Sequence, residues 1–133
     1  MSHDYLFVYG TLRRDINSEM HHLLARYGKF LGDATFQGKL YMLDYYPGLV
    51  QSDNPQDVVN GEVYKLSCPN AALSRLDDYE ECGPTFSEPT KYVRRKLDVK
   101  LKMGEVISAW IYIFARPTIG LRLIQSGDFL RRN

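Results

Sequence analysis

A dense apolar and aromatic run at residues 5–9, cut off by Gly10, constrains the fold more than any other stretch of the chain. Such a run predicts a buried strand, and the glycine ends it. Because Gly10 has no side chain, a ligand can lie directly against the main chain there. The amide groups of Gly10, Thr11 and Leu12 can then converge on an anion or a carbonyl oxygen. Taken alone, the stretch favours the simpler interpretation, a strand that ends at a glycine turn.

Length and composition indicate one soluble globular domain over residues 1–133. The net charge is +1 and both signs are spread along the chain, which gives no indication of a nucleic-acid or anionic-membrane partner. No secretory signal and no membrane-spanning apolar run is expected. The two cysteines, Cys68 and Cys82, lack a paired-spacing motif, which favours a reducing, cytoplasmic environment.

Hydrophobic periodicity predicts mostly strands, with two helices. The helices are expected at residues 18–27, ended by Gly28, and at residues 69–79, with Pro69 in the first turn. The strands do not alternate with helices as strict βαβ units. The predicted fold class is therefore α+β, a small mixed β-barrel of about six or seven strands with two flanking helices. Strands are expected at residues 5–9, 29–43 (one or two strands, bent near Gly32 and Gly38), 48–51, 58–66, 92–101 and 108–115.

A cluster of acids follows the second predicted helix. Residues 77–81 hold four acids interrupted by Tyr79, and for Asp77, Asp78 and Glu81 a solvated helix end is the favoured interpretation. Acids at a helix C-terminus are unfavourable with the macrodipole. A carboxylate shielded there by Tyr79 and the barrel walls would have its pKa raised by desolvation. Such a group suits proton transfer near neutral pH.

Several motifs, taken in order, resemble the γ-glutamylcyclotransferase-like family, in particular its small bacterial-type members. They are Tyr9-Gly10-Thr11-Leu12-Arg13, Leu76-Asp77-Asp78-Tyr79-Glu80, Tyr92-Val93-Arg94-Arg95, Ala109-Trp110-Ile111-Tyr112 and the tail at residues 124–129. The resemblance implies a substrate pocket at one end of the barrel and Glu80 as the acid–base residue. The chain departs from the family in having Glu81 where glycine usually follows that glutamate. Helical phase selects Glu80, because it lies four residues after Leu76 and seven after Leu73.

The reaction that the resemblance implies is an intramolecular cyclisation. The α-amine of a γ-glutamyl amide attacks the γ-carbonyl, giving 5-oxoproline and a free amine or amino acid, and no cofactor is needed. Glu80 would act as general base and then general acid. The amides of residues 10–12 would hold the α-carboxylate or the oxyanion, and the sequence leaves both roles open. The predicted substrate-binding residues are Tyr9, Gly10, Thr11, Leu12, Arg13, Tyr92 and Tyr112.

Some of these residues have equally simple structural interpretations. Tyr92 and Tyr112 are candidate pocket hydroxyls, and packing on the sheet is as good an interpretation for each. Arg13 and Arg94 are candidates to neutralise a carboxylate, although a surface position is favoured for both.

Other function classes are weaker. A thiol hydrolase needs a histidine partner, and neither cysteine has a recognisable signature. His21 and His22 point about 100° apart on a helix, so no metal site is expected. The main alternative is a catalytically silent protein that binds a small γ-glutamyl ligand, and the third is a structural interaction protein. The sequence indicates neither the leaving group of the substrate nor the oligomeric state.

Overall fold

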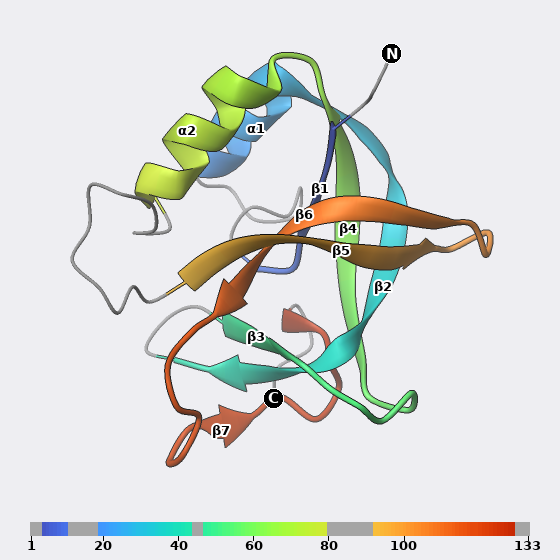
Figure 1. The fold of residues 1–133 in the computed structure, drawn as a ribbon, viewed down its shortest axis with the longest axis vertical. Helices are drawn as coiled ribbons and strands as arrows, with labels where there is room; N and C mark the ends of the chain where they lie inside the picture. The colour runs from blue at the N-terminus through green and yellow to red at the C-terminus, as the bar shows by residue number, and fades with distance from the viewer. Residues whose placement is uncertain (1–3, 11–18, 44–46, 80–91, 130–133) are drawn as a thin grey trace.

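The structure, a computed structural model, describes residues 4–10, 19–43, 47–79 and 92–129 (Figure 1). This part of the chain forms seven strands and two helices. In chain order they are β1 (Asp4–Val8), α1 (Glu19–Tyr27), β2 (Gly28–Met42), β3 (Pro47–Gln51), β4 (Val58–Leu66), α2 (Pro69–Tyr79), β5 (Tyr92–Leu101), β6 (Val106–Phe114) and β7 (Arg122–Leu123).

Five of the strands close into a barrel. Their order is β2-β4-β1-β6-β5, and the barrel is closed by pairing of β2 with β5 at Ala34↔Leu101 and Thr35↔Lys100. The pairings are antiparallel except for β1 with β6, which run parallel at Leu6↔Trp110. Closure leaves these five strands without a free edge. The α+β fold class and the small mixed barrel predicted from the sequence are therefore confirmed.

The long strand β2 joins the barrel to two outer strands. Its register against β4 shifts between Phe30 and Gly32, where the sequence predicts a bend. At Gly38 its partner changes, because Gln37 pairs with β4 whereas Gly38 pairs with β3. The far end of β2 then carries β3 on one side and β7 on the other. One continuous strand therefore belongs both to the barrel wall and to the outer sheet that β2 forms with β3 and β7 (Figure 1).

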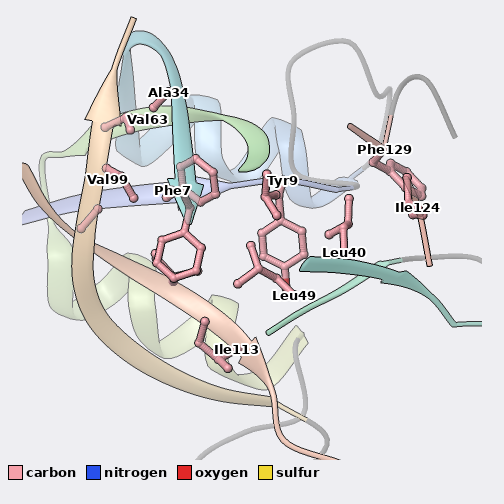
Figure 2. Packing of buried hydrophobic residues seen from close by; sticks show 14 residues of the cluster. Phe7, Tyr9, Ala34, Leu40, Leu49, Val63, Val99, Ile113, Ile124 and Phe129 are labelled. Carbon is pink, nitrogen blue, oxygen red and sulfur yellow. The ribbon is translucent and has the colours of Figure 1, made fainter. Parts of the chain in front are cut away.

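Alternation along the strands divides the core into two clusters. Phe7 and Tyr9 point into the barrel, where they meet residues of every barrel strand and of the C-terminal segment (Figure 2). Leu6 and Val8 point outward and pack beneath the two helices, which lie on the same side of the barrel (Figure 1). Both faces of β1 are thus buried from Leu6 to Val8, which explains why these residues form an unbroken apolar run.

The helix and strand bounds agree with the predicted bounds to within two residues, and the short strand β7 was not predicted. α2, β4 and β5 begin and end where they were predicted, and Gly104 has the positive φ of a hairpin turn. β3 begins at Pro47, one residue before the predicted start. β6 begins at Val106 rather than Ser108, because pairing with β5 continues to Lys100↔Val106. In the described ranges, no helix is long and apolar enough to cross a membrane.

Candidate active site

Tyr9 directly follows β1, and its side chain lies inside the barrel with 7% of its surface exposed. Its hydroxyl donates a hydrogen bond of 2.5 Å to the main-chain carbonyl of Tyr112 on β6. The hydroxyl of Tyr9 is therefore used to hold the end of β1 against β6.

Gly10 follows at a crowded position. A Cβ atom built on Gly10 would lie 2.8 Å from Cγ and 2.9 Å from Cδ of Pro47, the first residue of β3. Main-chain contact with the Pro47 ring thus requires glycine here. The carbonyl of Pro47 accepts a hydrogen bond of 2.7 Å from the hydroxyl of Tyr92, at the start of β5. The ends of β1, β3 and β5 meet at this point.

The end of α2 approaches the same strands through Asp77. Arg94 of β5 binds the Asp77 carboxylate in a fork, with Nε 2.8 Å from Oδ1 and Nη2 3.1 Å from Oδ2. The hydroxyl of Tyr112 on β6 donates a third hydrogen bond, of 2.7 Å, to Oδ1. Trp110 lies beside this cluster, with its ring centroid 4.5 Å from the Arg94 guanidinium carbon.

Two expectations from the sequence are corrected here. Asp77 is not a solvated helix end, and Arg94 is not a free surface residue; their side chains are only 20% and 24% exposed. The reason lies in helical phase, since Asp77 follows the buried Leu73 by four residues and so faces the sheet. That spacing was the signal in the sequence that could have identified Asp77.

Glu62 on β4 is a second buried acid that was not predicted from the sequence, and it is 1% exposed. It pairs across the sheet with Val8, the last residue of β1, and with Asp33 of β2. The hydroxyl of Tyr64 donates a hydrogen bond of 3.3 Å to Glu62 Oε1. Its place on the helix-facing side of β4, in phase with Tyr64 and Leu66, was the available signal.

Four of the predicted site residues are described, and contacts join them in two groups. Tyr9 and Tyr112 are joined directly, and Gly10 and Tyr92 are joined through Pro47. The predicted residues Thr11, Leu12, Arg13 and Glu80, together with Glu81, lie outside the described residues. They directly follow Gly10 and Tyr79, at the ends of β1 and α2.

The described residues offer little for a metal ion or a second ligand. Among them, no three His, Cys, Asp or Glu side chains lie together as metal ligands. A partly open hollow of about 200 Å³ is lined by residues of β2, β4, the connection before β4 and the C-terminal segment, including the polar residues Lys39, Asp57 and Asn60. None of the described site residues lines it.

Comparisons with known proteins place this chain in one family. Residues 6–131 match the family described as gamma-glutamyl cyclotransferase, AIG2-like. The gamma-glutamylcyclotransferase family protein YtfP of Escherichia coli K12 is 36% identical over 129 residues, which cover 96% of this chain and 97% of that protein.

Solved structures agree. YkqA from Bacillus subtilis superposes with a TM-score of 0.71 at 27% identity, over 96% of this chain and 40% of that chain. An AIG2-like protein from Mus musculus superposes with a TM-score of 0.71 at 25% identity, over 92% of this chain and 86% of that one. These matches support a γ-glutamylcyclotransferase-like function. The chain belongs to the gamma-glutamyl cyclotransferase, AIG2-like, family.

Proposed function

We propose that this protein is an enzyme that converts a γ-glutamyl amide, either a γ-glutamyl amine or a γ-glutamyl amino acid, to 5-oxoproline and the free amine. Family membership supports the reaction class. The observation that carries the proposal to this site is the double contact of Tyr112, which reaches Asp77 near the end of α2 and Tyr9 at the end of β1. The two segments proposed to do the chemistry follow directly from these two ends.

In the proposed mechanism the substrate supplies both reacting groups. Glu80 takes a proton from the α-ammonium, and the free amine attacks the γ-carbonyl carbon to form a tetrahedral intermediate. The carbon–nitrogen bond to the leaving amine then breaks as Glu80 returns the proton to that nitrogen. The attacking nitrogen loses its second proton as the lactam forms, and the released amine takes up that proton. No water is consumed. Good alignment of the amine on the carbonyl is worth roughly 7–11 kcal/mol, and the proton transfers add about 10²–10⁴-fold.

The strand ends supply the binding surface in this proposal. Main-chain amides of Gly10, Thr11 and Leu12 hold the α-carboxylate or the developing oxyanion, and Arg13 lies beside them in sequence. Each hydroxyl of Tyr9, Tyr92 and Tyr112 already donates a hydrogen bond to a protein acceptor. In this proposal these tyrosines therefore contribute to the site through their aromatic rings and not through their hydroxyls. A small-molecule substrate suits such a site.

The test is a panel of γ-glutamyl amines and γ-glutamyl amino acids incubated with the protein, with 5-oxoproline measured by mass spectrometry. We expect release from at least one compound, and Glu80→Gln should lower kcat at least about 100-fold because the group that moves the proton is lost. Glu81→Gln is the matched control, since it removes an adjacent carboxylate, and it should keep kcat within about threefold. Both variants should unfold at the wild-type temperature.

Two results would contradict the proposal. Wild-type turnover by Glu80→Gln would remove Glu80 from the mechanism. Binding of γ-glutamyl compounds in calorimetry, without 5-oxoproline from any of them, would support a catalytically silent binding protein instead. The presence of Glu81 in place of the usual glycine favours that second candidate.

A further inference from the structure

Asp77, Arg94 and Tyr112 form a three-residue anchor that fixes the end of α2 to the sheet. Arg94 and Tyr112 are directly opposite partners on β5 and β6, so their side chains stand on the same face of the sheet. The Asp77 carboxylate lies over this pair and accepts three hydrogen bonds from it, at 2.7, 2.8 and 3.1 Å. One helix residue is thereby held by two neighbouring strands.

This anchor is more than an exposed surface ion pair. Both charged side chains are about four-fifths covered, and the guanidinium engages the carboxylate through two donors. Trp110 stacks against the guanidinium, and its own indole nitrogen donates to Asp4, so Trp110 is also held. The arrangement restricts both the distance and the orientation of α2 relative to β5 and β6.

The position of Asp77 in the helix points to a tertiary role. An acid in the last turn of a helix opposes the helix dipole, and a basic residue there would stabilise the helix better. α2 has no basic residue in its last turn. The carboxylate of Asp77 thus stabilises the docking of α2 on the sheet rather than the helix itself.

The same Tyr112 also fixes the end of β1, since its carbonyl accepts the hydrogen bond of Tyr9. We propose that Asp77, Arg94 and Tyr112 are positioning residues, which set the carboxylate that follows α2 at its working distance from the main-chain amides that follow β1. This inference rests on the proposed function. None of the three residues needs to transfer a proton, because they act through the place they give to Glu80.

A positioning role has a distinct kinetic signature. Substrate held by the amides after β1 should bind as before when α2 is displaced, so KM should stay within about twofold. The proton transfer depends steeply on distance, and a displacement of about 1 Å can cost on the order of 100-fold. We therefore expect kcat to fall about 10- to 100-fold. A residue that bound substrate directly would raise KM instead.

Two conservative variants test this with the γ-glutamyl compound that the wild-type protein turns over best. Tyr112→Phe removes one hydroxyl but keeps the ring and the carbonyl that binds Tyr9. Arg94→Lys keeps the charge but cannot form the two-donor fork. Both variants should show the loss of kcat. The double variant Tyr112→Phe with Asp77→Asn should lose less kcat than the product of the losses in its two single variants, because both changes break the same contact between Tyr112 and Asp77.

The matched control is Ser108→Ala. It removes a hydrogen bond of 3.2 Å to Asp98 between directly opposite residues of the same two strands, without touching α2. It should keep kcat and KM. Circular dichroism and thermal unfolding would establish that every variant is folded.

The outcomes separate the two proposals. An active wild-type protein whose Tyr112→Phe and Arg94→Lys variants keep kcat, or whose KM rises while kcat stays, would overturn the positioning role alone. A folded wild-type protein that releases no 5-oxoproline from any γ-glutamyl compound would overturn the proposed function and this inference together.

Discussion

At the residue scale, Glu62 shows how a charged side chain is accommodated in a strand that is buried on both faces. Burying a carboxylate is costly unless hydrogen bonds replace water. Tyr64, two residues along the same face of β4, supplies one such bond at 3.3 Å, and its ring packs edge-on against Phe30 with centroids 5.6 Å apart. The hydroxyl of Tyr64 thus donates a hydrogen bond to Glu62, while the ring of Tyr64 packs in the core.

Tyr64→Phe separates these two contributions. The variant keeps the ring and removes one donor from a buried carboxylate, so we expect the free energy of unfolding to fall by about 1–3 kcal/mol. Urea denaturation measures the change. Tyr5→Phe, at a half-buried tyrosine that packs against the barrel core, is the control and should stay within about 0.5 kcal/mol. If Tyr64→Phe lowered the free energy of unfolding no more than Tyr5→Phe does, the Tyr64 hydroxyl would not stabilise the buried Glu62.

The gathering of Tyr9 with Tyr112, and of Gly10 with Tyr92, could be anticipated from the order of the motifs, but their contacts could not. Helical phase places Asp77 on the buried side of α2 without telling which strands face it. The pairing of Asp77 with Arg94 joins α2 to β5 across 17 residues of sequence, and local patterns do not encode how a helix docks on a strand.

At the element scale, two glycines in neighbouring strands differ in whether the structure has room for a side chain. A Cβ atom on Gly61 of β4 would collide with the Val8 carbonyl of β1 and would lie 2.6 Å from the ring of Phe7. A Cβ atom on Gly32, at the register shift of β2, would meet nothing within 4 Å. Close approach of β1 therefore requires the first glycine, whereas the second has room for a side chain.

Alanine substitutions test this contrast. Gly61→Ala should destabilise the protein by about 1–3 kcal/mol, because the added methyl group pushes β1 away from the barrel wall. Gly32→Ala should be neutral or stabilising by up to about 1 kcal/mol, since it reduces the freedom of the unfolded chain. Guanidinium denaturation of both variants measures the difference. A Gly61→Ala variant as stable as Gly32→Ala would show that β1 is free to shift.

The elements were easier to predict than their partners. Apolar runs and turn residues fixed most bounds in advance, because each depends on a few neighbouring residues. Parallel pairing of β1 with β6, and the change of partner of β2 at Gly38, depend on residues far apart in sequence. These two pairings are determined by the closure of the whole barrel and not by any one stretch of sequence.

At the scale of the whole molecule, the segment after β7 completes the interior of the barrel. Ile124 and Phe129 are buried, and they lie beside Leu40 (Figure 2). Main-chain hydrogen bonds of 2.7 Å tie Ile124 to Leu40 and Gly127 to Asn60. Gly127 has φ +68 and stands against the Val58 carbonyl, so no other residue fits there without strain.

Phe129→Ala tests whether this segment and the barrel unfold as one unit. The ring is 2% exposed in the same cluster as Phe7 and Val99, so its loss should cost about 3–5 kcal/mol through lost contacts and the cavity left behind. Ile119→Ala, at a side chain that is 93% exposed, should change stability by less than about 0.5 kcal/mol. Urea denaturation followed by circular dichroism measures both. If the segment were an independent appendage, Phe129→Ala would leave the midpoint of barrel unfolding where it is in the wild-type protein. A shared core instead requires that midpoint to move to lower urea with an unchanged slope, because the same surface is still exposed in a single transition.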